Sequence, residues 1–408
     1  MTESRIFVVV GAGQAGGWCA RTLRDSGFEG RVVLVGDEDY APYERPPLSK
    51  EALTGDAPIE SAYLWPPASW AEIGVELLLG RRAERIEPDE HRLVLAGGEA
   101  LAYDRLMIAT GSRPRRLAVP GADLPGIHMI RTMHDTEAIR ADVGPGDTAV
   151  VVGGGWIGLE AAAALVKLGM TVVVAEAAGR LCGRAVTPAI SDWLLGFHRA
   201  KGIDVRLSCA AERFEGDDRL ERVALTDGSV VDARLCVVGI GILPNVELAA
   251  DAGIATENGI TVDDRCRTSA ADVFACGEVT SHPNALLGRR LRLESWENAQ
   301  NQGICGGKAM LDQAEPYNEV PWFWSDQFDA NLQLVGVPED WDEEATRGDP
   351  AEGTFITFYL KGGRIEGAVA VNQGRDIRVA RRLMQAGATV TAAELADPSV
   401  KLQALLKR

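Results

Sequence analysis

Residues 8–18 read VVVGAGQAGGW and residues 150–160 read VVVGGGWIGLE, so the chain carries nearly the same string twice. Each string is an apolar run, then Gly-x-Gly-x-x-Gly, and a helical, alanine-rich stretch follows. In such a turn the first glycine permits the tight bend, the second lets a pyrophosphate approach the backbone, and the third lets the helix pack on the strand. One string alone could be accidental. Two in matching contexts predict two dinucleotide-binding units.

Short β-branched runs alternate with helical stretches through two thirds of the chain, which is typical of βαβ units in a parallel sheet. In the first third the expected strands are Ile6–Val10, Arg31–Val35, Val75–Leu79, Arg92–Ala96 and Arg105–Ala109. In the middle third they are Thr148–Val152, Thr171–Ala175, Val205–Leu207, Val223–Thr226 and Leu235–Gly239. The two thirds therefore read as two copies of one architecture.

The composition changes after Pro321, where the aromatic and acidic string PWFWSDQFD begins. The pattern predicts strands near 332–335, 354–359 and 364–371, a helix around 377–386, and a solvated acidic loop at Glu339–Glu344. The fold class expected is α/β: two Rossmann-like dinucleotide-binding domains followed by a C-terminal α+β domain.

Charge and cysteine content exclude several functions. Lys and Arg total 42 against 59 Asp and Glu, a net charge of −17, which argues against nucleic acid as a partner. The seven cysteines are scattered without any C-x-x-C, so the sequence predicts reduced, buried thiols and neither a disulfide framework nor a metal site. A strand expected from Ile6 leaves no room for a signal peptide, and there is no apolar run of about 18 residues. We therefore expect a cytoplasmic protein without a membrane partner.

Carboxylates are expected about 20 residues after each glycine string, where they bind ribose hydroxyls. Asp37 follows the second strand, and Glu176 follows the strand Thr171–Ala175. A carboxylate at position 176 repels a 2′-phosphate, so the second unit should prefer NADH to NADPH. Arg180 would weaken this preference if it received the phosphate.

Further strings carry a resemblance to known families. With Ile108-Ala-Thr-Gly-Ser-Arg-Pro114 and Val273-Phe-Ala-Cys-Gly-Glu278, the whole chain resembles the glutathione-reductase-type flavoprotein superfamily. The strings RPPLSK (45–50), ESWENA (294–299) and PWFWSDQ (321–327) look like the ferredoxin reductases of oxygenase systems, the putidaredoxin reductase-like group. The resemblance implies FAD in the first unit, NADH in the second, and a [2Fe-2S] ferredoxin that feeds a P450 or Rieske oxygenase in aromatic hydrocarbon catabolism. It implies an FAD-binding domain over 1–113 and 245–320, an NAD-binding domain over 114–244, and a C-terminal domain over 321–408.

The resemblance also assigns roles to residues. Lys50 would lie beside the flavin ring and pair with Glu160, which would face the nicotinamide carboxamide, and Trp324 would lie next to the flavin. Glu278 stands where the family usually has Asp. The expected FAD contacts are Gly11, Gly13, Gln14, Ala15, Gly16, Asp37, Arg45, Lys50, Ala83, Ala109, Thr110, Gly111, Arg131, Gly277, Glu278, Ser295 and Trp296. The expected NAD contacts are Gly153, Gly155, Trp156, Ile157, Gly158, Glu160, Glu176, Arg180, Gly239, Ile240 and Gly241.

The missing cysteines point to direct electron transfer. Disulfide reductases of the superfamily relay electrons through cysteines, but residues 37–60 contain none, so electrons should leave the flavin for an external acceptor. A basic docking patch is expected at Arg289, Arg290 and Arg292, or as a second choice at Arg378, Arg381 and Arg382. The alternatives are an NADH:rubredoxin reductase and a non-enzymatic, redox-sensing flavoprotein resembling apoptosis-inducing factor. We expect a monomer or a weak homodimer.

Overall fold

The computed structural model describes residues 5–407, which divide into two compact units. Unit 1 comprises Met1–Glu44, Ala62–Arg113 and Leu243–Trp322, and unit 2 comprises Arg45–Ser61, Pro114–Ile242 and Phe323–Arg408. The chain passes from one unit to the other within β8 (Ser112–Pro114) and β17 (Ile242–Pro244). Within residues 5–407, no helix is long and apolar enough to cross a membrane.

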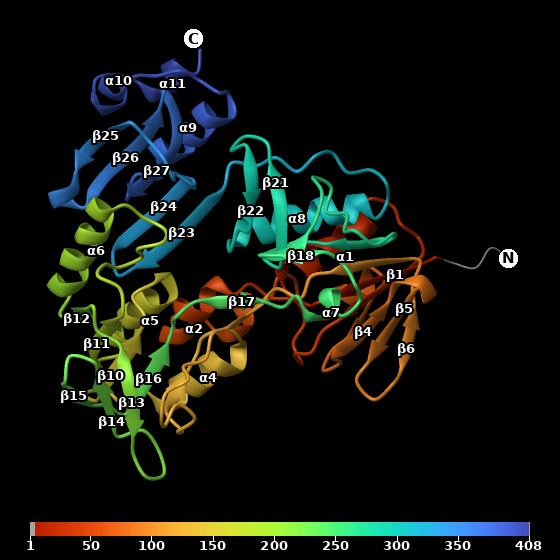
Figure 1. The fold of residues 1–408 in the computed structure, drawn as a ribbon, viewed down its shortest axis with the longest axis horizontal. Helices are drawn as coiled ribbons and strands as arrows, with labels where there is room; N and C mark the ends of the chain where they lie inside the picture. The colour runs from red at the N-terminus through yellow and green to blue at the C-terminus, as the bar shows by residue number, and fades with distance from the viewer. Residues whose placement is uncertain (1–4, 408) are drawn as a thin grey trace. The chain divides into compact units, whose positions relative to one another are not determined.

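Unit 1 is built on a five-stranded parallel sheet with β1 at its centre (Figure 1). In sheet order the strands are β20 (Val273–Ala275), β7 (Arg105–Ile108), β1 (Ile6–Val10), β2 (Arg31–Val35) and β3 (Val75–Leu78). Successive side chains of a strand point to opposite faces. Phe7 and Val9 therefore enter one hydrophobic cluster and Val8 and Val10 another, and all four are at most 4% exposed.

Two smaller sheets and four helices complete unit 1. The antiparallel sheet is β4 (Ala83–Glu87), β5 (Arg92–Leu95) and β6 (Ala100–Ala102), and the mixed sheet is β18 (Thr256–Glu257), β19 (Gly259–Thr261), β21 (Thr280–Asn284) and β22 (Arg289–Leu291). The helices are α1 (Gln14–Asp25), α3 (Ser69–Glu72), α7 (Glu247–Ala250) and α8 (Trp296–Ala309).

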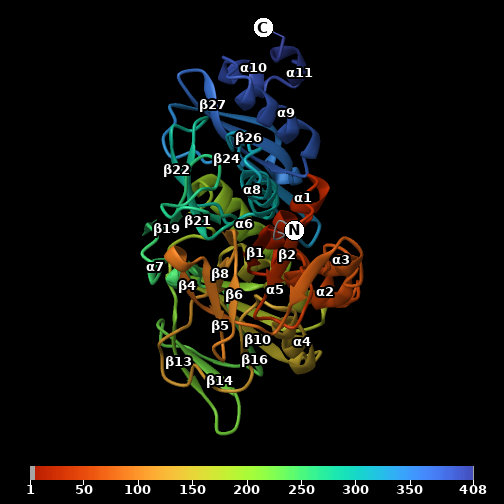
Figure 2. The same cartoon turned by 90° about the vertical axis from the view of Figure 1, so that its right-hand side faces the viewer.

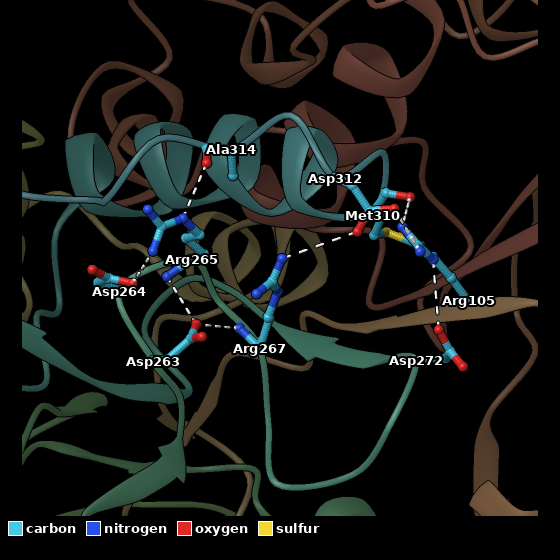
Figure 3. A network of polar contacts seen from close by, with 9 residues as sticks. All are labelled: Arg105, Asp263, Asp264, Arg265, Arg267, Asp272, Met310, Asp312 and Ala314. Atoms are coloured by element: carbon cyan, nitrogen blue, oxygen red, sulfur yellow. Dashed lines mark hydrogen bonds and ion pairs between the residues drawn. The ribbon is translucent and has the colours of Figure 1, made fainter.

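Helix α8 packs closely against α1, and arginines hold the segment that follows it. A Cβ at Gly303 would lie 2.5 Å from the Ala15 carbonyl oxygen, so only glycine permits this approach. Figure 3 shows Arg105 donating to the carbonyl oxygen of Met310 at 2.7 Å, and Arg265 donating to that of Ala314 at 3.2 Å. The two arginines thus fix the segment that follows the C-terminal end of α8, and Gly303 allows the helix itself to lie close to α1.

Unit 2 repeats the same sheet with β10 at its centre. In sheet order the strands are β12 (Asp204–Leu207), β11 (Thr171–Glu176), β10 (Thr148–Val152), β16 (Leu235–Val238) and β9 (Ile127–His128). A three-stranded sheet follows with β13 (Ala211–Glu215), β14 (Arg222–Leu225) and β15 (Val230–Asp232). The helices of this part are α2 (Glu51–Thr54), α4 (Met133–Asp142), α5 (Trp156–Lys167) and α6 (Pro188–Ala200), with a 3₁₀ turn η1 at Pro46–Ser49.

The C-terminal part of unit 2 is a five-stranded sheet with three helices after it (Figures 1 and 2). In sheet order the strands are β23 (Trp322–Gln327), β24 (Ala330–Gly336), β27 (Arg364–Val371), β26 (Thr354–Lys361) and β25 (Glu343–Asp349). The helices are α9 (Gly374–Gln385), α10 (Ala392–Ala396) and α11 (Leu402–Leu405). Residues of this sheet, such as Leu332 and Phe355, share one hydrophobic cluster with Leu159 and Leu165 of α5.

The expected fold class is confirmed, with two details that differ from expectation. Residues Arg45–Ser61 fall in unit 2, because α2 packs on α4 and α5 and Leu53 enters their hydrophobic cluster. The acidic loop expected at Glu339–Glu344 is shorter, because Glu343 and Glu344 begin β25 and pair with β26.

Candidate functional site

The three glycines of the first Gly-x-Gly-x-x-Gly motif are needed for different structural reasons. Gly11 has a φ of +109°, and a Cβ there would lie 2.1 Å from the Ala109 carbonyl oxygen, while a Cβ at Gly16 would lie 1.9 Å from the Gly11 oxygen. Both positions thus exclude any side chain. Gly13 has an extended φ of −90°, and a Cβ there would meet nothing within 4 Å. Packing in the protein does not require Gly13, so the open space before it fits a ligand at the start of α1.

Several expected FAD contacts of unit 1 meet around this helix start. A Cβ at Gly277, which follows β20, would lie 2.8 Å from the Ala15 Cβ. The Gln14 amide donates to the Trp296 carbonyl oxygen at 2.9 Å, and so joins α1 to the start of α8. Ser295 caps α8 by accepting from the Asn298 amide. Ala109, Thr110 and Gly111 follow β7, and the Ala109 oxygen faces Gly11.

The Glu278 carboxylate is hydrogen-bonded within unit 1. The Ser112 hydroxyl donates to one carboxylate oxygen at 2.8 Å. Two further FAD contacts were predicted in unit 1. Asp37 is exposed after the carboxyl end of β2, and Ala83 is the first residue of β4. The carboxylate of Glu38, next to Asp37, already accepts from the Tyr43 hydroxyl at 2.5 Å.

The second string repeats the geometry of the first. Gly153 has a φ of +111°, and a Cβ there would lie 2.4 Å from the Gly239 carbonyl oxygen. A Cβ at Gly158 would lie 2.0 Å from the Gly153 carbonyl oxygen. A Cβ at Gly155 would again meet nothing within 4 Å. Trp156 begins α5 with its ring 5.3 Å from the ring of Phe323, and the apolar side chain of Ile157 is 43% exposed. Ile240 and Gly241 follow β16, and the Gly241 carbonyl oxygen accepts from the Arg115 amide.

Glu176 is fixed by the backbone at the end of β11. One carboxylate oxygen accepts from the Gly154 amide at 2.6 Å and the other from the Ala178 amide at 2.7 Å. The guanidinium of Arg180 is committed elsewhere, because it donates to the carbonyl oxygens of Gly183 and Val186 and to the Ser191 hydroxyl. Arg180 is thus held within the protein and does not extend from it.

Lys50, Glu160 and Trp324 form one group in unit 2. The Lys50 ammonium lies 3.3 Å from a Glu160 carboxylate oxygen, 3.8 Å from a carboxylate oxygen of Asp326, and 5.1 Å from the centre of the Trp324 ring. Burial raises the pKa of Glu160, against the opposing effect of Lys50 and of the hydroxyls of Ser325 and Ser49. The Ser49 hydroxyl donates at 2.5 Å and the Ser325 hydroxyl at 2.6 Å. The pairing of Lys50 with Glu160 thus exists in the folded chain.

Arg45 and Arg131 also lie in unit 2, where the Arg45 guanidinium donates to the Arg131 carbonyl oxygen. The backbone amide of Arg131 donates to Asp135, whose carboxylate also completes the capping box of α4.

In the basic patch predicted near β22, Arg290 is exposed and Arg289 and Arg292 are half-buried. The Arg290 guanidinium donates to the carbonyl oxygens of Val262 and Ser281, and Arg292, with a side chain only 13% exposed, pairs with Glu294. Both arginines therefore bind within unit 1. On α9, Arg378 and Arg382 are also exposed, and Arg381 is half-buried.

Sequence reasoning missed four polar residues that support these groups. Ser49 and Ser325 contact Glu160, Gln327 contacts Ser325, and Gln302 of α8 accepts from the Gly277 amide at 2.8 Å. Three of them stand in the quoted strings RPPLSK and PWFWSDQ. For Ser325 and Gln327 the signal was two polar residues at alternate positions of a strand that begins with three aromatic residues.

Known proteins resemble the chain over its full length. The family model for pyridine nucleotide-disulphide oxidoreductases matches residues 6–303, and the model for the reductase C-terminal region matches residues 322–406. The ferredoxin--NAD(+) reductase component of the anthranilate 1,2-dioxygenase system of Burkholderia cepacia is 42% identical over 98% of this chain and 99% of its own. The ferredoxin reductase subunit of the 5,5′-dehydrodivanillate O-demethylase of Sphingobium sp. is 40% identical over 98% of this chain and 97% of its own.

A solved structure agrees with these relatives. The reductase in the covalent putidaredoxin reductase–putidaredoxin complex superposes with a TM-score of 0.96 at 35% identity, over 99% of this chain and 98% of that one. The chain therefore belongs to the pyridine nucleotide-disulphide oxidoreductase family, and within it to the ferredoxin reductases whose motifs it shares.

Proposed function

We propose that this protein is an FAD-dependent NADH:ferredoxin oxidoreductase that passes electrons from NADH through FAD to a [2Fe-2S] ferredoxin, which in turn feeds an oxygenase. The observation that carries the proposal is the pair of matching helix starts. In each, two glycines are required by packing, and the middle one, Gly13 or Gly155, faces open space. Free backbone amides at a helix start bind phosphate, so each opening fits the pyrophosphate of a dinucleotide.

We assign FAD to unit 1 and NADH to the parallel-sheet part of unit 2. Residues 1–113 and 245–320 would be the FAD-binding domain, 114–244 the NAD-binding domain, and 321–408 a C-terminal domain. Gly277 and the start of α8 support the assignment of unit 1, because Gly277 lies against Ala15 and Trp296 accepts from Gln14 at the start of α1. Glu176 supports the assignment of unit 2, because its carboxylate is already held where a ribose is expected.

When bound, the nicotinamide supplies a hydride, and the flavin accepts it and gives up single electrons. The chain contributes mainly by positioning the nicotinamide and by balancing the charge of the Glu160 carboxylate. Glu160 would accept from the carboxamide and so orient the nicotinamide, and Lys50 compensates the charge of Glu160. Trp324 packs against the Lys50 ammonium and limits its movement. We propose these three as the residues that meet the reacting rings.

The experiment is to purify the protein with its flavin, to identify the flavin after release, and to measure NADH oxidation with two acceptors. We expect one FAD per chain, rapid reduction of ferricyanide, and rapid turnover with a [2Fe-2S] ferredoxin. Turnover with rubredoxin in place of ferredoxin would support the rubredoxin reductase alternative. Flavin reduction by NADH without turnover on either iron protein would contradict the enzymatic proposal and favour a redox-sensing flavoprotein.

The partner and compartment follow from the same proposal. The seven cysteines are all free, which fits the reducing cytoplasm. For ferredoxin docking we propose Arg378 and Arg382 on α9, which are exposed, and keep Arg289, Arg290 and Arg292 near β22 as the other candidate patch.

A further inference from the structure

Strand β23 has a polar inward face. Ser325 and Gln327 are both 0% exposed, and so is His198 of α6, while Glu160 of α5 is 4% exposed. Burying a polar group costs free energy unless its hydrogen bonds are made. Four adjoining polar side chains at this depth therefore need an explanation beyond packing.

The four side chains form one continuous line of hydrogen bonds. The Ser325 hydroxyl donates to Glu160 at 2.6 Å, and the Gln327 amide nitrogen donates to the Ser325 oxygen at 2.9 Å. His198 Nε2 lies 2.7 Å from the Gln327 amide oxygen, which can only accept, so Nε2 carries the proton. Burial lowers the pKa of His198, which keeps the ring neutral.

All donors of this line point the same way. His198 donates to Gln327, Gln327 to Ser325, and Ser325 to the carboxylate. Hydrogen bonds in such a row polarise one another and strengthen the last one. The row therefore acts on the carboxylate as a single, directed donor.

The carboxylate has room for one more partner. An ionised carboxylate accepts about four hydrogen bonds. The Ser49 hydroxyl donates to one carboxylate oxygen of Glu160. The Ser325 hydroxyl donates to the other oxygen, which also pairs with the Lys50 ammonium. These fixed contacts hold the carboxylate in one orientation and leave one acceptor direction.

We propose that Ser325, Gln327 and His198 are positioning residues for nicotinamide binding: together they fix the Glu160 carboxylate so that its remaining acceptor direction meets the carboxamide. This inference rests on the proposed function, because it takes Glu160 as the residue that binds the nicotinamide. It extends the binding machinery from α5 through β23 of the C-terminal part to α6.

The test is a double-mutant cycle on the FAD-loaded enzyme, with NADH as donor and ferricyanide as acceptor. Ser325→Ala should raise the KM for NADH about tenfold, the usual effect of losing a hydrogen bond to a charged group. His198→Phe should raise it less, about two- to threefold, since it removes only the outer end of the row. In the Ser325→Ala background, His198→Phe should add nothing, because its effect passes through Ser325.

Tyr359→Phe is the matched control. It removes a buried hydroxyl hydrogen bond to Thr187 in the same unit, 2.9 Å long and without contact to Glu160, and should leave the KM unchanged. If Ser325→Ala does not fold, Ser325→Cys gives a weaker donor of similar shape and should raise the KM in the same direction. Additive effects of the two substitutions, or an unchanged KM in the Ser325 variants, would overturn the inference. Failure of the wild type to oxidise NADH would instead overturn the proposed function.

Discussion

At the scale of single residues, the Glu176 carboxylate is held in one orientation by backbone amides. Both carboxylate oxygens accept from backbone amides, those of Gly154 and Ala178, so on the proposed assignment little reorganisation would be needed for ribose hydroxyls to bind. The Gly154 amide belongs to the glycine turn itself, so on the same assignment one turn would hold both the ribose and the pyrophosphate. The nearby Arg180, with its guanidinium on carbonyl oxygens, does not offset the negative charge for a 2′-phosphate.

Glu176→Ala should therefore reduce the preference for NADH over NADPH. We expect the wild type to prefer NADH at least tenfold in kcat/KM, since about 1.4 kcal/mol suffices for each factor of ten. The variant should lose most of this preference because the repulsion of the 2′-phosphate is gone. Arg180→Ala is the control and should leave the preference unchanged. A wild type that uses both cofactors equally would refute the assignment, and a shifted preference in Arg180→Ala would give that residue a cofactor role.

His282 should make stability depend on pH. It is 2% exposed, neither ring nitrogen has a hydrogen-bond partner among the described residues, and burial with the nearby Arg290 lowers its pKa to about 4. The unfolded chain binds a proton here below about pH 6.5 and the folded chain only below about pH 4, so folding stability falls as pH drops between these values. Between pH 7 and pH 5 the loss should be about 2 kcal/mol.

The measurement is the free energy of unfolding of His282→Phe and of wild type at pH 7 and pH 5. The variant should lose less stability on acidification, because Phe fills an apolar site beside Tyr317 and does not titrate. His134→Gln, at a side chain 64% exposed on α4, is the control and should behave as the wild type. Equal acid sensitivity of His282→Phe and wild type would show that this histidine contributes nothing.

At the scale of elements, the start of α5 contains one glycine that packing requires, Gly158, and one that only a ligand would require, Gly155. Gly155→Ala should fold with the thermal stability of the wild type, because its Cβ meets no protein atom within 4 Å. Its KM for NADH should rise at least tenfold, because the methyl group occupies the space of the pyrophosphate. Gly158→Ala should fail to fold or lose several kcal/mol, because its Cβ would lie 2.0 Å from the Gly153 oxygen. The measurements are thermal unfolding and steady-state kinetics, and an unaltered KM in Gly155→Ala would place the pyrophosphate elsewhere.

Strands and helices with a clear hydrophobic pattern could be predicted from the sequence. The core strands β1, β2, β10 and β11 lie within a residue of expectation, because buried parallel strands are continuous apolar runs. The grouping of Arg45–Ser61 with unit 2 could not be predicted, because it depends on Leu53 packing with α4 and α5, far away in sequence. The same holds for the site. Motifs identified Lys50 and Glu160, whereas Gln327 and His198 are 129 residues apart and only the fold brings them together.

At the scale of the whole molecule, net charge and local charge must be kept apart. The chain carries −17, yet at physiological salt the Debye length is about 8 Å, so charges at a contact outweigh distant ones. Arg378→Glu with Arg382→Glu should raise the KM for ferredoxin several-fold, with ferricyanide reduction unchanged, and the difference should shrink at high salt. Arg213→Glu with Arg222→Glu, at two exposed arginines on β13 and β14, is the matched control. If the α9 variant and the control behave alike, ferredoxin docks on another surface.

The thiols decide which mechanism the whole chain can support. All seven cysteines are free and buried. Burial raises the pKa of the thiols of Cys19, Cys182 and Cys236, whereas the hydrogen bond with Cys266 lowers the pKa of Cys305. A neutral, buried thiol is neither a nucleophile nor an accessible electron carrier. Iodoacetamide should therefore leave the native protein with its cysteines unmodified by mass spectrometry, and NADH should still bleach the flavin without oxygen. Replacing cysteines singly by Ala or Ser should leave that bleaching rate unchanged, apart from variants that lose the flavin.

Unfolding in denaturant before alkylation is the control, and it should expose all seven thiols to the reagent. If modification of one thiol in the folded, FAD-loaded protein abolished reduction by NADH, electrons would pass through sulfur, and direct transfer from flavin to ferredoxin would be refuted.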